Sequence, residues 1–186
     1  MNRYCYAIAC LGLFIAIPAS AQPTFDKIVK KASATFEPAT AKPGQTVTLK
    51  VSLELLEGWS TYPTVQTDKA ARSYVNKLAF PEPGAIVFVG NILDPDSPKE
   101  KAEPMASIEK MLYYPGGGIW EKKAVVLPDA KAGSLSSKVK FKILVCDKDN
   151  CLPPRTLELE ATLKVAGDPV AVEPKYKAEI EKALKK

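Results

Sequence analysis

The chain has 186 residues, of which 46% are hydrophobic and 25% charged, and its formal net charge is +5. The lysines are interspersed with acidic residues rather than gathered into a stripe with aromatics, so the composition argues against nucleic-acid binding. Histidine is absent from the sequence, which excludes Ser-His-Asp and Cys-His catalytic groups and every metal site built on imidazole.

The sequence opens with the pattern of a secretory signal peptide. Arg3 precedes an apolar run over residues 4–17, and small residues occupy positions 19–21. This pattern predicts cleavage after residue 21, so that residues 1–21 are removed on export. Neither this run nor any later one reaches the ~20 apolar residues of a transmembrane helix. We therefore expect a soluble mature chain without a transmembrane segment, periplasmic or otherwise extracytoplasmic.

Residues 22–35 are expected to form a lead-in segment with a helical turn, and the first clear strand follows over residues 46–56. Apolar residues alternate there with polar ones, namely Val47, Leu49, Val51, Leu53 and Leu55. Alternation with a period of two places one face of a strand against a core. Residues 57–58 end this strand, and Trp59 and Tyr62 follow at its tip.

Further short strands are predicted between turns that contain Pro, Gly and Asp. They cover residues 77–80, 86–89, 119–127, 137–145 and 156–165. Strands of this length and spacing favour an all-β fold, an antiparallel β-sandwich expected over residues 36–167. The polar segment 94–104 is expected to be a solvated loop, and residues 115–118, PGGG, a flexible one.

Residues 168–186 are expected to form a C-terminal tail with a short helix. Tyr176, Ile180 and Leu184 recur at helical spacing after Pro174, amid lysines. This spacing predicts an apolar stripe that packs against one edge of the sandwich.

One pair of cysteines, Cys146 and Cys151, follows the leader. They end one predicted strand and begin the next, with turn-forming residues 147–150 between them. Such a hairpin brings facing side chains within reach of a disulfide, with Cα atoms expected about 4.4–6.8 Å apart. Two thiols so placed pair in an oxidising compartment. Because two thiolates without histidine or a second cysteine pair make a poor zinc site, we expect no metal and no cofactor.

Two functions are consistent with this pair. A structural disulfide would close a loop of about six residues, which contributes only about 2 kcal/mol through chain entropy. The protein would then be a non-catalytic extracytoplasmic β-sandwich that binds a protein or an envelope polymer, with Trp59 and Tyr62 as exposed contacts. An exchangeable disulfide would instead carry electrons. The spacing of the two cysteines by itself leaves both interpretations open.

The hairpin segment VCDKDNCLPPRTLEL, residues 145–159, resembles the active-site hairpin of the amino-terminal periplasmic domain of DsbD-type thiol:disulfide interchange proteins, a disulfide bond corrector-like domain. The Cys-x4-Cys-Leu-Pro-Pro core is its specific part. Residues 47–62 are similar to the long strand and aromatic tip of that domain. Residues 113–116, YYPG, and the strand over 119–128 resemble its cap loop and the following strand. The resemblance covers most of residues 47–165.

This resemblance implies an immunoglobulin-like fold and the activity of a thiol:disulfide interchange oxidoreductase of the protein-disulfide reductase type. Cys146 and Cys151 would be the redox pair, with Cys151 entering the mixed disulfide. Tyr113 and Tyr114 would belong to a cap over the sulfurs, and Tyr62 would lie beside the active site.

The implied partners are thioredoxin-like periplasmic proteins and a membrane electron donor. We expect neither the transmembrane electron-transfer domain nor the carboxy-terminal thioredoxin-like domain of full-length DsbD on this chain. Both partners are therefore expected on separate chains, and the cysteine pair would pass reducing equivalents to or from them.

Overall fold

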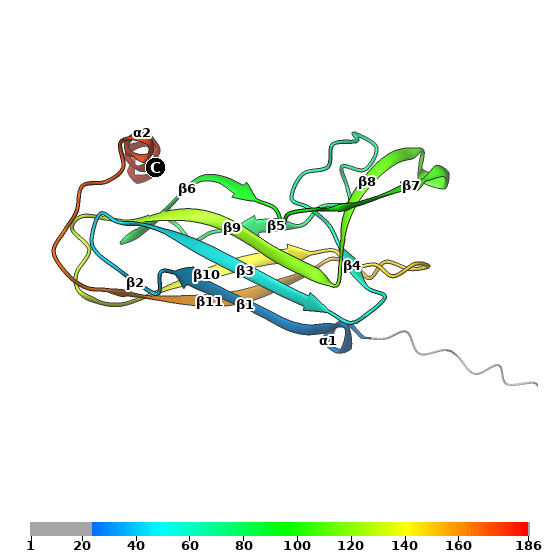
Figure 1. The fold of residues 1–186 in the computed structure, drawn as a ribbon, viewed down its shortest axis with the longest axis horizontal. Coiled ribbons are helices and arrows are strands. Elements are labelled where there is room, and N and C mark those ends of the chain that lie inside the picture. The colour runs from blue at the N-terminus through cyan, green and yellow to red at the C-terminus, as the bar shows by residue number, and fades with distance from the viewer. Residues whose placement is uncertain (1–23, 186) are drawn as a thin grey trace, which may run out of the picture.

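Two four-stranded sheets pack face to face as a β-sandwich (Figure 1). A computed structural model describes residues 24–185, and the expected leader over residues 1–21 lies outside this part of the chain. The first sheet is antiparallel, in the order β1 (Val29–Glu37), β3 (Thr46–Leu55), β9 (Gly117–Val126) and β6 (Ile86–Leu93). The second sheet has the order β2 (Thr40–Ala41), β11 (Arg155–Val165), β10 (Gly133–Ile143) and β5 (Lys77–Ala79).

The second sheet is antiparallel except where the short strand β2 runs parallel to β11. All the apolar side chains of β3 that alternate in sequence are buried between the sheets. Trp120 from one sheet packs on Phe141 from the other, with ring centroids 4.9 Å apart. The predicted all-β, immunoglobulin-like sandwich is confirmed. In the described part of the chain, neither helix combines the length and the apolar character needed to cross a membrane.

A third, smaller sheet stands at one end of the sandwich (Figure 1). It contains β4 (Ser60–Thr61), β8 (Ile108–Pro115) and β7 (Lys99–Glu103), and a 3-10 turn, η1 (Pro104–Ala106), joins β7 to β8. The expectation of a loop over residues 94–104 was therefore wrong for its second half. The sequence of β7, KEKAE, has no apolar alternation because its side chains lie on a hairpin outside the main core.

The sandwich begins earlier in the chain than residue 36, where the sequence placed its start. The helical turn α1 (Phe25–Ile28) buries Phe25 and Ile28 in the main core, and β1 starts directly after it. The signal was weak because β1 carries Ala and Lys where long apolar residues make alternation visible.

The C-terminal helix α2 (Pro174–Leu184) covers part of the first sheet at the end opposite α1 (Figure 1). Ile180 packs there on outward-facing Val87, Val89 and Val125. The predicted helix is confirmed, but its stripe is shorter than expected, since Leu184 is 52% exposed.

Residues 115–118 form a tight turn rather than a flexible loop. Gly117 has a φ of +106°, and a Cβ atom added there would lie 2.0 Å from the carbonyl oxygen of Leu53. Gly116 also has a positive φ, but a Cβ atom added there would meet nothing within 4 Å. This close passage of β9 against β3 directs β8 away from the sandwich.

We predict that Gly117→Ala destabilises the protein more than Gly116→Ala. Both substitutions place alanine at positive φ, which costs about 1 kcal/mol. Only Gly117→Ala adds a steric clash with backbone, for which about 1–3 kcal/mol more is expected. Thermal unfolding of both variants beside the unsubstituted protein measures the difference. Equal midpoints for the two variants would contradict the close approach at Gly117.

Candidate functional site

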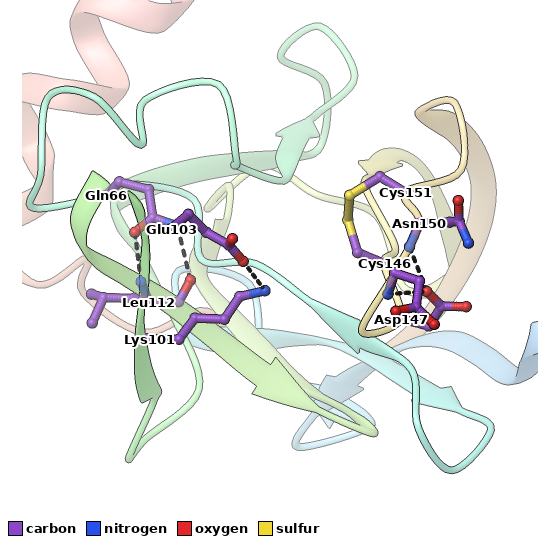
Figure 2. Close-up of polar contacts among 9 residues, drawn as sticks. Gln66, Lys101, Glu103, Leu112, Cys146, Asp147, Asn150 and Cys151 are labelled. Carbon is purple, nitrogen blue, oxygen red and sulfur yellow. Dashed lines mark hydrogen bonds and ion pairs between the residues drawn. A yellow bond between two sulfur atoms is a disulfide. The ribbon is translucent and has the colours of Figure 1, made fainter. Parts of the chain in front are cut away.

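A turn closes the cysteine hairpin, and the side chain of Asp147 stabilises this turn. The backbone N–H of Asp147 donates to the carbonyl oxygen of Asn150 at 2.9 Å. In return, Oδ1 of Asp147 accepts the backbone N–H groups of Asp149 at 2.8 Å and Asn150 at 2.6 Å (Figure 2). These two hydrogen bonds lower the pKa of Asp147, so its carboxylate is already occupied by the turn.

Cys146 and Cys151 face each other across this hairpin and form a disulfide of 2.02 Å. Hydrogen bonds flank the pair, from Asp147 to Asn150 and from Leu152 to Val145, so the cysteines themselves are a non-hydrogen-bonded pair. Facing residues come closest in pairs of this kind. Accordingly their Cα atoms are 4.0 Å apart, just below the range expected from the sequence.

The two cysteines differ sharply in exposure. Cys146 is only 3% exposed, whereas Cys151 is exposed. The backbone of Cys146 also exchanges two hydrogen bonds with Ser60, at 3.0 Å and 2.8 Å, which places it between β4 and Cys151. A macromolecular partner that approaches this hairpin therefore meets Cys151 first.

A cavity of about 350 Å³ lies against the buried cysteine. Its lining residues are Gly58, Ser60, Tyr62, Lys101, Glu103, Tyr113, Cys146, Asp147 and Lys148. Burial raises the pKa of Tyr62, which keeps this phenol neutral. The structure thus places two of the three tyrosines singled out from the sequence, Tyr62 and Tyr113, in the wall of the cavity that Cys146 also lines.

Tyr114 lies elsewhere, in the main core. It packs edge-on against Trp120, with ring centroids 6.1 Å apart, and burial raises its pKa to about 12. Tyr113 and Tyr114 diverge because residues 113–116, expected to form a cap loop, lie mostly in strand β8, where successive side chains point to opposite faces. Trp59 and Tyr62, proposed as exposed contacts of a binding module, are buried.

Two charged residues of β7, Lys101 and Glu103, were missed by sequence reasoning. Their side chains form an ion pair of 2.7 Å and extend toward the cysteine hairpin (Figure 2). The ammonium of Lys101 lies 5.7 Å from the ring centroid of Tyr113. Only the recognition of β7 as a strand would have revealed them, because residues 101 and 103 then share one face.

The β7–β8 hairpin is anchored by side chains of the segment between β4 and β5. The amide of Gln66 accepts the N–H of Leu112 at 2.9 Å and donates to the carbonyl oxygen of Leu112 at 2.8 Å (Figure 2). It also donates to the carbonyl oxygen of Tyr74 at 2.8 Å. Asp68 accepts the N–H groups of Glu109 at 3.0 Å and Lys110 at 3.3 Å. These side chains take the place of a neighbouring strand along β8.

No family model and no curated protein matches the chain. Solved structures similar to it include the N-terminal periplasmic domain of ScsB from Proteus mirabilis, at 13% identity over 83% of this chain with a TM-score of 0.45. This chain spans about half, 52%, of that chain.

A second similar structure is the N-terminal domain of Neisseria meningitidis DsbD in the reduced form. It shares 15% identity over 81% of this chain and 96% of its own, with a TM-score of 0.39. A PapD-like domain of human CEP192 follows at 14% identity, over 90% of this chain and all of its own, with a TM-score of 0.31. A DsbD amino-terminal domain, the kind that the hairpin resembles in sequence, is thus among the similar structures.

We predict that Gln66→Ala loosens the β7–β8 hairpin. The substitution removes three hydrogen bonds at a half-buried position, each with a net contribution of about 0.5–1.5 kcal/mol. Hydrogen exchange at the Leu112 amide should accelerate by about tenfold or more. Thr67→Ala, at the exposed neighbouring residue, is the control. Unchanged exchange at Leu112 in Gln66→Ala would show that the anchor contributes nothing.

Proposed function

We propose that this protein carries out thiol-disulfide exchange through Cys146 and Cys151. The single observation that carries the proposal is the asymmetry of the pair, with one sulfur-bearing residue exposed and the other buried. Exchange requires one accessible sulfur to form a mixed disulfide and a second, adjacent sulfur to resolve it. The Cys-Leu-Pro-Pro motif supports the same assignment through its resemblance to the DsbD hairpin.

In the first step the thiolate of Cys151 attacks one sulfur of a partner's disulfide. A bond forms between Cys151 and the partner, and the partner's second sulfur leaves with the electron pair. Cys146, as a thiolate, then attacks the Cys151 sulfur and releases the partner. The partner gains two electrons as a dithiol, and the hairpin becomes oxidised. The reverse sequence reduces the hairpin again.

The proposed partners are thioredoxin-like proteins and a membrane electron donor on separate chains. The proposed compartment is extracytoplasmic, because the leader pattern of residues 1–21 directs export and a disulfide persists in an oxidising environment. Exposed Pro153 and Pro154 follow Cys151 after one intervening residue, Leu152. Because proline has no backbone N–H, this stretch offers few donors for competing strand pairing, which keeps the approach to Cys151 open.

We predict that the disulfide exchanges under native conditions with a reduction potential above about −300 mV. The bond closes a loop of only six residues, from Cys146 to Cys151, so little chain entropy protects it from reduction. Equilibration with redox buffers of graded potential, followed by alkylation and mass spectrometry, gives the value. A potential well below that limit would support the structural disulfide of a binding module instead.

We further predict that Cys146→Ser accumulates a stable mixed disulfide with an oxidised thioredoxin-like protein. The exposed Cys151 remains to attack, while the residue that resolves the adduct is gone. Cys151→Ser should trap much less, since its remaining thiol is buried. Non-reducing gels of both variants make the comparison, with circular dichroism as a check on folding. Equal trapping by the two would contradict the division of roles.

A further inference from the structure

We propose that Lys101 and Glu103 of β7 set how readily Cys146 leaves as a thiolate when the disulfide is opened. The inference rests on the proposed exchange reaction and adds two residues to it. Lys101 would favour the departing thiolate, and Glu103 would oppose it. The two residues would thereby act on the reacting sulfur through charge alone, without a covalent step of their own.

The step concerned is reduction of the hairpin. A thiolate of the reductant attacks the exposed Cys151 sulfur, a new disulfide forms there, and the bond between Cys151 and Cys146 breaks. The electron pair of that bond goes to Cys146, which becomes a thiolate in a buried position. A second thiolate of the reductant then releases Cys151, and the reductant leaves as a disulfide. Burial disfavours an anion, so nearby charge decides how easily Cys146 accepts the electron pair.

Several charged and titratable groups line the cavity beside Cys146. Besides Lys101 and Glu103, these are Asp147, Lys148 and the two phenols, Tyr62 and Tyr113. The carboxylate of Asp147 accepts two backbone N–H groups of the turn, which lower its pKa, so it contributes the same negative charge in every variant. The side chain of Lys148 is 89% exposed, so solvent screens its charge strongly, whereas that of Lys101 is 32% exposed.

Lys101 is also the better fixed of the two lysines. Its ammonium is held by Glu103 at 2.7 Å and lies over the face of the Tyr113 ring. Figure 2 shows the Lys101 and Glu103 side chains extending from β7 toward Cys146 and Asp147. A positive and a negative charge thus stand at the same wall of the cavity, so that removal of either one leaves the other unbalanced.

This balance gives the two substitutions opposite signs. Lys101→Gln leaves Glu103 unpaired and should disfavour the Cys146 thiolate, while Glu103→Gln leaves Lys101 unpaired and should favour it. If the ion pair only stabilised the β7–β8 hairpin, both substitutions would change the stability of the Cys146 thiolate in the same direction. The double variant should return close to the unsubstituted protein.

The β7–β8 hairpin offers a matched control. Glu100 of β7 and Lys110 of β8 form an ion pair of the same 2.7 Å length on this hairpin, and neither lines the cavity. Glu100→Gln and Lys110→Gln therefore change the charge of the hairpin by the same amounts without changing the charge that faces Cys146.

The experiment measures two quantities in the full chain. Equilibration with glutathione redox buffer gives the equilibrium constant for reduction, and the rate of reduction by dithiothreitol gives the leaving-group effect. We expect Lys101→Gln to lower both by about threefold to tenfold and Glu103→Gln to raise them comparably. A tenfold change in the equilibrium constant equals about 30 mV.

A pH profile provides a readout that a structural role would not move. In a Cys151→Ser background, the alkylation rate of Cys146 followed by mass spectrometry reports its thiolate fraction at each pH. The profile should shift to higher pH in Lys101→Gln and to lower pH in Glu103→Gln. The control pair should leave it unchanged.

The possible failures are distinguishable. If neither glutathione nor dithiothreitol reduces the unsubstituted protein under native conditions, the proposed function is wrong. If reduction proceeds but Lys101→Gln and Glu103→Gln shift the constants in the same direction, or no further than the control variants, exchange stands and the inference about these two residues is overturned.

Discussion

A buried ring of hydrogen bonds fixes the position of the cysteine hairpin. The Thr61 hydroxyl accepts from the amide of Asn76 at 2.8 Å and donates to the carbonyl oxygen of Leu144 at 2.9 Å. The ring closes where Oδ1 of Asn76 accepts the Leu144 N–H at 3.0 Å. Thr61 and Asn76 are fully buried, and an unsatisfied polar group there would cost about 1–3 kcal/mol, so the ring forms as a whole.

This ring determines where the two cysteines lie. Leu144 stands two residues before Cys146, and Thr61 directly follows Ser60, whose backbone pairs with Cys146. The backbone of Cys146 is therefore held on two sides, by Leu144 two residues earlier in the chain and by Ser60 of β4. Cys151 lies on the side of Cys146 away from Ser60, and within residues 24–185 it has no comparable anchor. This arrangement explains the difference in exposure, because Cys146 is held against β4 while Cys151 lies at the outer side of the hairpin.

Much of this architecture is legible in the sequence, because a strand that buries one face must alternate. The alternation from Val47 to Leu55 predicts β3, and the turn residues between the cysteines predict their hairpin. Alternation fails where a strand does not border the main core, as in β7, whose outer hairpin is held by backbone pairing and polar side chains. The anchors Gln66 and Asn76 are invisible for a related reason, since polar residues in irregular segments carry no periodic signal.

The charged residues of the cavity wall could not be predicted from the sequence near the cysteines. Three features far from the cysteines in sequence bring Lys101 and Glu103 to the cavity beside Cys146. They are the β7–β8 pairing, the turn at Gly116 and Gly117, and the pairing of β4 with β8. None of these is encoded within a few residues of the cysteines. The electrostatic control proposed for Cys146 therefore depends on the tertiary fold. A hairpin with the same Cys-x4-Cys spacing on another sandwich would face different charges, and its disulfide would have a different potential.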